Sequence, residues 1–338
     1  MMPALRSVLV VRVAAIGDVV MASALVSRLR AEHPTARITW LCGVGVAPLV
    51  AAFGVDEVVT VDERALLRGG RLGALGALLP VWKRLVGRRF DLVLVAHTDR
   101  RYDVLVAGAR AGTRRALRGS WGPVRGRAFV DAYAALLDEG ARRGPTRRSW
   151  DVVDLREAAL PTVSSSAQVL LVPGGARNVL REAPHRRWPV DSYVELARRL
   201  RQQGLGVALL GGPGDEWVRL AFAGLDVEDR IGRYSLLETV SAMRSAELVI
   251  SHDTGPMHLA RLVRAPMIAL FGPTMPSEFV PSGAREVAVE WGGADLACRP
   301  CYDGREFAAC ARHLCVEEIA VDRVEALALQ RLAPEART

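Results

Sequence analysis

Residues 251–260, SHDTGPMHLA, place an acid, a hydroxyl, a glycine and a histidine directly after the apolar run ELVI. The pattern predicts a strand that ends near Ser251 and a helix that begins at Gly255. The first turn of a helix has unpaired backbone N–H groups and the positive end of the helix dipole, so it attracts phosphate. Thr254 and Gly255 would lie at that turn, and Asp253 would hydrogen-bond sugar hydroxyls. The segment therefore predicts a turn that binds a phosphate and a sugar.

Two further strand ends in the second half of the chain carry similar chemistry. After QVLLVP, Gly174 and Gly175 let backbone N–H groups approach a ligand closely. Arg186, just before a W-P pair, could offer paired donors to a diphosphate or could be a surface arginine. The stretch GGPGDE at 211–216 ends in Glu216 and fits either a ligand-binding turn or an ordinary turn before a helix. Three such strand ends in one domain predict a nucleotide-sugar site at the carboxyl edge of its sheet.

Asp18 follows the first apolar strand, in RVAAIGDVVMASAL. A carboxylate at the carboxyl edge of a sheet could accept a proton from a substrate hydroxyl. The alternative is an acid that the helix dipole favours in a first turn, with Gly17 making the turn, and both interpretations can hold together. The dinucleotide fingerprint is absent, because this turn has one glycine where G-x-G-x-x-G needs three.

The histidines near these turns have both a functional and a structural interpretation. His258 either belongs to the ligand site or is a buried histidine that finds its partners within the core. His97, with Asp99 and Arg100, follows another strand of the first half and would face an acceptor, where the arginine would meet an anionic group. The alternative is a helix cap followed by exposed arginines.

The composition limits the class of protein. The chain has 338 residues, of which 50% are hydrophobic, so it is long enough for two domains with buried cores. No apolar run approaches the roughly 18 residues that span a bilayer, and the N-terminus lacks the pattern of a signal peptide; we therefore expect a cytoplasmic protein. The formal charge of +8 comes almost entirely from arginine, with no interleaved aromatic residues to stack bases. The charge favours solvated surface, an anionic substrate or the inner face of a membrane over nucleic acid.

Apolar runs alternate with amphipathic stretches in two series. In the first series we expect strands at SVLVVRV, RITWLC, EVVTV and FDLVLVAH, one helix over AAIGDVVMASALVSRLRAEHP, and a helical stretch to about Arg88. In the second series we expect strands at QVLLVP, GVALLGG, ELVIS and PMIALFG, with helices over VDSYVELARRLRQQG, from about Gly214, around SLLETVSAMRSA and after ELVIS. The alternation predicts an α/β fold with parallel sheets. Residues 151–166 would link a domain of residues 1–150 to one of residues 167–338.

Four segments together resemble the heptosyltransferases, the bacterial glycosyltransferase family 9. They are RVAAIGDVVMASALVSRLR, PGGAR…RRWPVDSYVELARRL, LLGGPGDE and SHDTGPMHLARLVRAPMIALFGPT, in this order across nearly the whole chain. The resemblance implies a GT-B fold, with two Rossmann-like domains facing a central cleft. It also implies an inverting transfer without a catalytic metal and ADP-heptose as donor. Residues 1–150 would bind the acceptor, and residues 167–338 the nucleotide sugar.

The resemblance also assigns roles to individual residues. Asp18 occupies the position of the family's base, and Arg186 that of a basic residue, often lysine, that meets the diphosphate. An arginine there keeps the charge and changes the geometry of the contact. Glu216 falls near the position that holds the ribose hydroxyls. The donor-binding motif covers Asp253, Thr254, Gly255 and His258.

Four of the five cysteines lie in the short span CRPCYDGREFAACARHLC, and Cys42 stands apart. Their spacing is C-x2-C-x8-C-x4-C, formed by Cys298, Cys301, Cys310 and Cys315. Four thiols this close could hold Zn or Fe, form two disulfides, or stay reduced, although a cytoplasmic enzyme disfavours disulfides. Similar segments of the autotransporter heptosyltransferases resemble an iron-binding knuckle, which implies a structural metal as one alternative.

Other functions fit parts of this pattern. The chain could transfer another sugar from another nucleotide, epimerise a nucleotide sugar, or act as a catalytically silent scaffold that binds one. An epimerase needs further acid and base residues on the donor side, which we do not find, and the intact Asp18, His258 and glycines argue against a silent scaffold. The acceptor could be lipopolysaccharide core, another glycan, a protein or a natural product. The sequence fixes neither the acceptor nor the oligomeric state.

Overall fold

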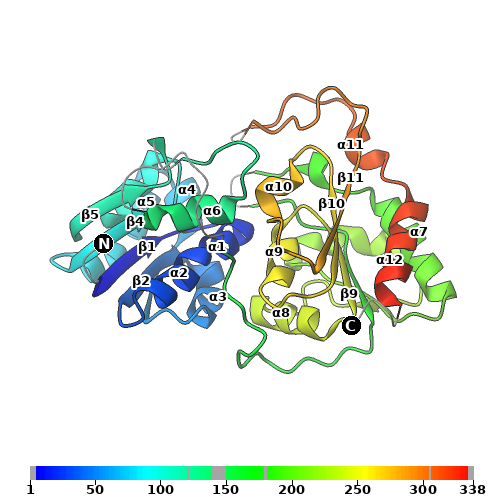
Figure 1. Cartoon of the computed structure of the whole chain (residues 1–338), viewed down its shortest axis with the longest axis horizontal. Coiled ribbons are helices and arrows are strands. Elements are labelled where there is room, and N and C mark those ends of the chain that lie inside the picture. The colour runs from blue at the N-terminus through cyan, green and yellow to red at the C-terminus, as the bar shows by residue number, and fades with distance from the viewer. Residues whose placement is uncertain (1–4, 120–121, 139–149, 179–180, 304–305, 334–338) are drawn as a thin grey trace. The chain divides into compact units, whose positions relative to one another are not determined.

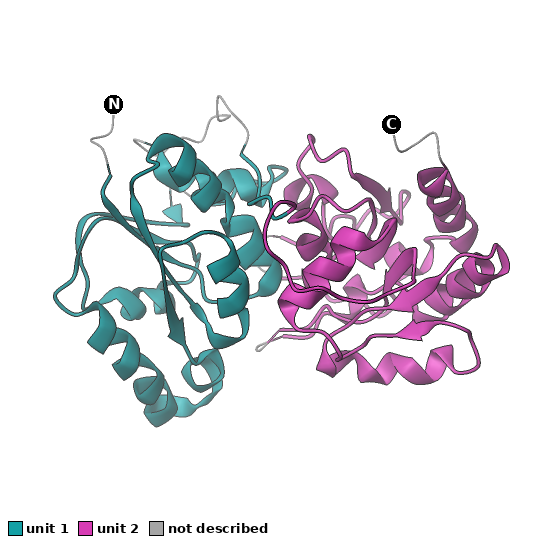
Figure 2. Cartoon of the chain, turned by 90° about the horizontal axis from the view of Figure 1, so that it is seen from below, with its two compact units in different colours: residues 1–155 teal, residues 156–338 magenta. Residues whose placement is uncertain are grey.

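The computed structural model describes residues 5–119, 122–138, 150–178, 181–303 and 306–333. The chain divides into two compact units, residues 1–155 and residues 156–338 (Figure 2). Each unit contains one sheet whose paired strands run parallel, with helices packed on the sheet (Figure 1). The predicted α/β class is confirmed. Among the described residues, none of the helices has the length and apolar character that crossing a bilayer requires.

The sheet of unit 1 has the strand order β3-β2-β1-β4-β5. Its central strands are buried along most of their length, so their sequences are continuous apolar runs. The edge strand β5 was not predicted, because its sequence RAGTRRA contains no such run. The strands are β1 (Ser7–Val11), β2 (Arg37–Gly43), β3 (Glu57–Val61), β4 (Arg89–Val95) and β5 (Arg110–Ala116).

The helices of unit 1 form two groups. Helix α5 and the 3-10 helix η2 share a hydrophobic cluster with the strands, whereas α6 packs against α1 and α2. The single helix predicted after β1 is wrong in one respect: the chain forms α1 and α2, separated at Ser23, whose hydroxyl donates to the Val20 carbonyl (2.6 Å). The helices are α1 (Ile16–Ala22), α2 (Ala24–Glu32), α3 (Ala47–Ala52), α4 (Glu63–Arg68), α5 (Gly70–Leu85), α6 (Phe129–Ala134), η1 (Val44–Val46), η2 (Arg100–Val106) and η4 (Ala135–Leu137).

The sheet of unit 2 has the strand order β11-β10-β9-β6-β7-β8. The strands predicted at QVLLVP, GVALLGG, ELVIS and PMIALFG are confirmed, and the edge strands β8 and β11 were not predicted. The strands are β6 (Val169–Val172), β7 (Val207–Leu209), β8 (Glu228–Asp229), β9 (Leu248–His252), β10 (Met267–Phe271) and β11 (Val287–Trp291).

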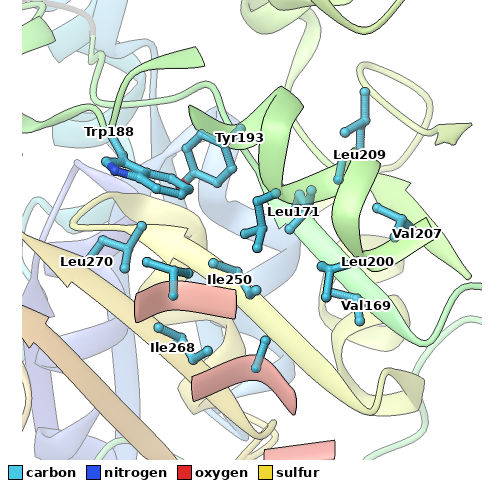
Figure 3. Close-up of a cluster of buried hydrophobic side chains, with 14 of the residues drawn as sticks. Val169, Leu171, Trp188, Tyr193, Leu200, Val207, Leu209, Ile250, Ile268 and Leu270 are labelled. Atoms are coloured by element: carbon cyan, nitrogen blue, oxygen red, sulfur yellow. The ribbon is translucent and has the colours of Figure 1, made fainter. Parts of the chain in front are cut away.

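The core of unit 2 lies between its sheet and three helical elements. Side chains of β6, β7, β9 and β10 meet those of α7, η6 and α12 in one buried cluster, and Figure 3 shows Trp188, Tyr193 and Leu200 over the strands. The Trp188 indole donates to the Ile319 carbonyl (2.9 Å), which ties the start of α7 to the segment before α12. The helices are η5 (Pro184–Arg186), α7 (Val190–Gln202), η6 (Pro213–Phe222), α8 (Leu236–Ser245), α9 (Gly255–Arg261), α10 (Pro276–Phe279), α11 (Leu314–Glu317) and α12 (Val321–Leu332).

Candidate functional site

The residues with predicted roles cluster after the carboxyl ends of central strands. In unit 1, Asp18 follows β1 and His97 follows β4, and these two strands are neighbours in the sheet. In unit 2, Gly174 follows β6 and Asp253 follows β9, which are also neighbours. Adjacent parallel strands end at one edge, so each unit gathers its polar groups at the carboxyl edge of its sheet.

Asp18 is held by a buried arginine. It lies in the first turn of α1, and its Oδ2 is 2.5 Å from the guanidinium of Arg12, which directly follows β1. Tyr133 of α6 donates its hydroxyl hydrogen to Asp18 Oδ1 (3.1 Å). Solvent still reaches Asp18, because 37% of its side chain is exposed. The carboxylate is thus oriented through both oxygens while it stays accessible to a substrate.

The Arg12 guanidinium is almost completely enclosed. Burial opposes its charged form, but Asp18, Tyr133 and Tyr102 together more than compensate and raise the pKa of Arg12 above its ordinary value. Arg12 also donates to the Ala96 carbonyl at the end of β4 (2.8 Å). The arginine therefore stays charged and joins α1 to two strands of the sheet.

His97 is buried. Its Nε2 accepts the backbone N–H of Val13 (3.0 Å), and its ring stacks on Tyr102 with centroids 3.6 Å apart. Burial, followed by the charges of Arg12 and Arg118, lowers the pKa of His97 well below its ordinary value, so the ring stays neutral. The geometry connects two strand ends, and the acceptor-binding role of His97 stays a prediction.

Asp99 and Arg100 lie at the start of η2. Asp99 accepts the backbone N–H of Arg101 (2.8 Å) and pairs with the guanidinium of Arg101, which is the capping interaction that the sequence offered as an alternative. Arg100 is exposed. Its side chain is available to an anionic group, and an acceptor role for Asp99 and Arg100 stays a prediction.

The glycine loop after β6 is folded by two side chains from other strand ends. Asp215 accepts the backbone N–H groups of Gly175 (2.7 Å) and Gly212 (2.8 Å), so one carboxylate joins the turns after β6 and β7. A Cβ at Gly174 would lie 2.5 Å from Asp215 Cγ, and Gly175 has a φ of +84°. Only glycine fits at both positions. The Thr254 hydroxyl accepts the backbone N–H of Ala176 (2.7 Å).

Arg186 and Asp253 form an ion pair in unit 2. The guanidinium lies 2.6 Å from Asp253 Oδ1, and Thr274 donates its hydroxyl hydrogen to Oδ2 (2.7 Å). Asp253 is only 1% exposed. Two residues predicted to contact different parts of a donor are therefore in contact with each other.

The neighbouring His252 is a buried, neutral group. Burial, followed by the charge of Arg186, lowers the pKa of His252 to about 3. Its Nδ1 lies 3.1 Å from the Tyr193 hydroxyl. The ring therefore connects β9 to α7 and stays uncharged at neutral pH.

The remaining predicted donor residues occupy different environments. Glu216 is in the first turn of η6, largely exposed, and pairs with Arg219 (3.2 Å). Gly255 begins α9 as predicted. His258 is buried in that helix, with its ring 6.2 Å from that of Phe279. The structure places Gly255 at the carboxyl edge of the sheet and His258 within the interior beside it.

A family model, curated sequences and solved structures all relate the chain to the heptosyltransferases. Residues 145–310 match the model of the glycosyltransferase family 9 (heptosyltransferase). The lipopolysaccharide core heptosyltransferase OpsX of Haemophilus influenzae is 22% identical over 288 residues, which are 79% of each chain. The Escherichia coli ADP-heptose LPS heptosyltransferase II has a TM-score of 0.71 at 21% identity, covering 97% of this chain and 99% of that chain. The chain is a distant homologue of the glycosyltransferase family 9 heptosyltransferases. Its fold is that of the GT-B heptosyltransferases.

A second similar structure holds a donor analogue. The Escherichia coli heptosyltransferase WaaC with ADP-2-deoxy-2-fluoro heptose has a TM-score of 0.69 at 18% identity, covering 96% of this chain and 99% of that chain. At these identities the comparison establishes the fold and distant homology.

Sequence reasoning missed four residues that shape these sites in the family 9 fold. Each leaves a trace in the sequence: one charge inside an apolar run, one acid after a glycine turn, one hydroxyl after F-G-P, and one aromatic hydroxyl in a short helix. None of these traces identifies its contact. The partners of Asp215, Thr274 and Tyr133 are distant along the chain, and the sequence does not show that Arg12 turns toward the nearby Asp18. The four are Arg12, Asp215, Thr274 and Tyr133.

The cysteine cluster does not form a metal site among the described residues. All five cysteines are free thiols. Burial, followed by the thiols of the other clustered cysteines, raises the pKa of Cys315 to about 11. No group of three or more His, Cys, Asp or Glu in the described segments has the arrangement that holds a metal ion. A structural zinc or iron at this cluster stays a prediction.

Thiol labelling distinguishes free thiols in the cysteine cluster from thiols that bind a metal. We expect a thiol reagent to modify Cys298 and Cys310 rapidly in the native protein, because both are exposed. Cys42 should react only after unfolding: burial, and then the charge of Glu63, raise its pKa to about 12, which suppresses the reactive thiolate. Mass spectrometry of labelled peptides, with Cys42→Ala as control, measures this. Protection of the clustered thiols that a chelator removes would contradict the expectation and indicate a bound metal.

Proposed function

We propose that the protein is an inverting glycosyltransferase that moves heptose from ADP-heptose to a hydroxyl of an acceptor. The observation that carries the proposal is the Asp18 carboxylate, oriented by Arg12 and Tyr133 and still open to solvent. Distant homology to the family 9 heptosyltransferases and the ADP-heptose analogue bound to WaaC support the choice of donor. In this proposal, unit 1 provides the base and binds the acceptor, and unit 2 binds the nucleotide sugar.

Asp18 acts as the general base in the proposed reaction. The acceptor oxygen attacks the anomeric carbon as the bond from that carbon to the diphosphate oxygen breaks on the opposite face. The proton of the attacking hydroxyl passes to the Asp18 carboxylate, and ADP leaves with the electron pair of the broken bond. General-base assistance of this kind is typically worth about 10²- to 10⁴-fold in rate.

Arg186 stabilises the leaving diphosphate in this proposal. One end of its guanidinium pairs with Asp253, and its Nε is buried without a hydrogen-bond partner among the described residues. That donor can turn to a diphosphate oxygen, where positive charge offsets the charge that builds as the bond breaks. The transfer we propose assigns this role to Arg186 and no catalytic role to a metal.

The glycine loop after β6 supports the assignment of unit 2 as the donor site. Asp215 and Thr254 hold the turn of Gly174 and Gly175 in a conformation that leaves no room for side chains. A backbone of this kind can approach a phosphate or a sugar closely. Glu216 is exposed at the next strand end, where its carboxylate could accept hydrogen bonds from ribose hydroxyls.

The acceptor is proposed only as a class. It carries a hydroxyl nucleophile, and exposed Arg100 favours an acceptor with an anionic group. Lipopolysaccharide core, another glycan, a protein and a natural product all meet this description. Asp99 stays paired with Arg101 and would orient the start of η2 beside such an acceptor.

Calorimetric binding tests the proposed donor. We expect ADP-heptose and ADP to bind at least about tenfold more tightly than UDP or GDP, because the homology to family 9 points to an adenine nucleotide. Asp253→Ala should weaken ADP-heptose binding, because it removes a sugar-side acceptor and the partner of Arg186. Asp226→Ala, at an exposed carboxylate of the same unit, is the control. It should leave the affinities for ADP-heptose and for ADP unchanged.

The other outcomes have definite meanings. Preference for UDP or GDP would keep the transferase fold and reject the heptose donor. Binding to no nucleotide or nucleotide sugar would reject the transferase and favour a scaffold protein.

A further inference from the structure

Helix α5 is apolar on two opposite faces, and the described part of the chain covers only one of them. One face packs into the core of unit 1 through Ala77, Leu78, Val81 and Leu85. A helix that needed only this contact would be polar on its other side. The other side of α5 carries exposed leucines instead.

The uncovered side forms a continuous stripe along the helix. Leu72, Leu75 and Leu79 follow one another at helical spacing and are 85%, 45% and 55% exposed. Gly76 lies between them on the same side, and Lys83 continues the stripe one turn further. Scattered exposed leucines are common on proteins, but three in register on one helix form a surface.

Basic residues surround this stripe. Residues 64–90 contain six arginines and one lysine and no aspartate or glutamate. Arg84 and Arg88 of this segment pair with Glu57 of β3, whereas Arg68, Arg71 and Lys83 are exposed at the ends and flank of α5. Long basic side chains beside leucines can keep their charges in water while their stems cover apolar surface.

We propose that this surface docks the protein onto an anionic membrane. We name it the α5 outer face, and it consists of Leu72, Leu75, Leu79, Arg68, Arg71 and Lys83. Leucines that enter the boundary between headgroups and acyl chains, with basic residues at the level of the phosphates, are the arrangement by which amphipathic helices bind a bilayer surface without spanning it. The inference goes beyond the proposed transfer and does not depend on its chemistry.

The charges favour a membrane over a second copy of the chain. Two copies that paired through the α5 outer face would bring two acid-free basic segments together, and like charges oppose that contact. An anionic lipid surface neutralises the same charges. It also accepts leucines of any arrangement, so it needs no groove shaped to match them.

Vesicle binding by the full chain tests the proposal. We expect the protein to co-sediment with vesicles in which about one lipid in three is phosphatidylglycerol, and to bind pure phosphatidylcholine vesicles about tenfold less well. The triple variant Leu72→Ser, Leu75→Ser, Leu79→Ser should lose about tenfold or more of the binding to the anionic vesicles. A second triple variant, Arg68→Gln, Arg71→Gln, Lys83→Gln, should reduce binding to the anionic vesicles by a similar factor. Added salt should weaken the binding of the wild-type protein to the same vesicles.

The matched control is Leu220→Ser. Leu220 of η6 in unit 2 is 87% exposed, as Leu72 is, but lies outside the α5 outer face, so its loss should change binding less than twofold. Thermal unfolding shows whether each variant is folded, and these exposed positions should tolerate the change. Equal binding to both kinds of vesicle, no binding, or a serine triple variant that binds as the wild type would overturn the proposal. A wild-type dimer that the triple variant makes monomeric, without vesicle binding, would show a contact between copies instead.

Discussion

Replacing Asp18 by asparagine is expected to lower kcat by about 10²- to 10⁴-fold, because an amide cannot accept the proton of the acceptor hydroxyl. Asparagine has nearly the shape of aspartate and can still accept the hydrogen bond of Tyr133. Donor affinity should therefore change little, because the substituted group belongs to unit 1 and the proposed donor site to unit 2. The expected result is a loss of turnover with donor binding retained.

The substitution also removes the negative partner of Arg12. Breaking a fully buried ion pair costs about 3–5 kcal/mol, and solvent at Asp18 should reduce this cost to about 1–2 kcal/mol. The Arg12 guanidinium keeps its hydrogen bond to Ala96. Thermal unfolding of the variant separates this loss of stability from the loss of catalysis.

A transfer assay with ADP-heptose, combined with calorimetric donor binding, measures the prediction. Asp191→Asn is the matched control: Asp191 also lies in the first turn of a helix, α7, but is exposed and has no proposed role. A folded Asp18→Asn protein with wild-type turnover would reject Asp18 as the base. Equal losses in both variants would indicate a general effect of removing a helix-start charge.

The fold could be predicted from the sequence wherever strands are buried on both sides. Runs such as QVLLVP and PMIALFG are apolar because helices cover both faces of a parallel sheet, and the structure confirms them. The edge strand β5 escapes this signal, because it is rich in arginine. The short break at Ser23 also escaped prediction, because it depends on one side-chain hydrogen bond.

The site could be predicted as a set of strand ends, but its internal contacts could not. Sheet topology brings Gly174 and Asp253 to one edge, and this follows from alternating strands and helices. The contact between Asp215 and Gly175 depends on a side chain 40 residues away, which no local pattern encodes. His97 shows the reverse case: its place at a strand end suggested an accessible group, and packing against Tyr102 buried it.

Replacing Arg186 by glutamine is expected to lower kcat/KM for ADP-heptose by about 10²- to 10³-fold, as losing one group that stabilises developing charge typically does. Arg186→Lys should recover most of this loss, because lysine restores the charge, although it cannot hold Asp253 and a phosphate with a planar fork. Arg198→Gln, at an exposed arginine of α7 paired with Glu195, is the control and should leave kcat/KM unchanged.

A double-mutant cycle with Asp253 decides what the Arg186 pair does. Asp253→Asn alone should also reduce kcat/KM, because Arg186 loses the carboxylate that holds its guanidinium in place. Residues in direct contact have coupled effects, so the double variant should lose less than the product of the two single losses. If each residue instead bound its own part of the donor independently, the losses would multiply. If the two losses in kcat/KM multiply, Arg186 and Asp253 do not act together as an ion pair. If the losses are coupled and each variant also weakens donor binding, Arg186 contacts the diphosphate and Asp253 positions it.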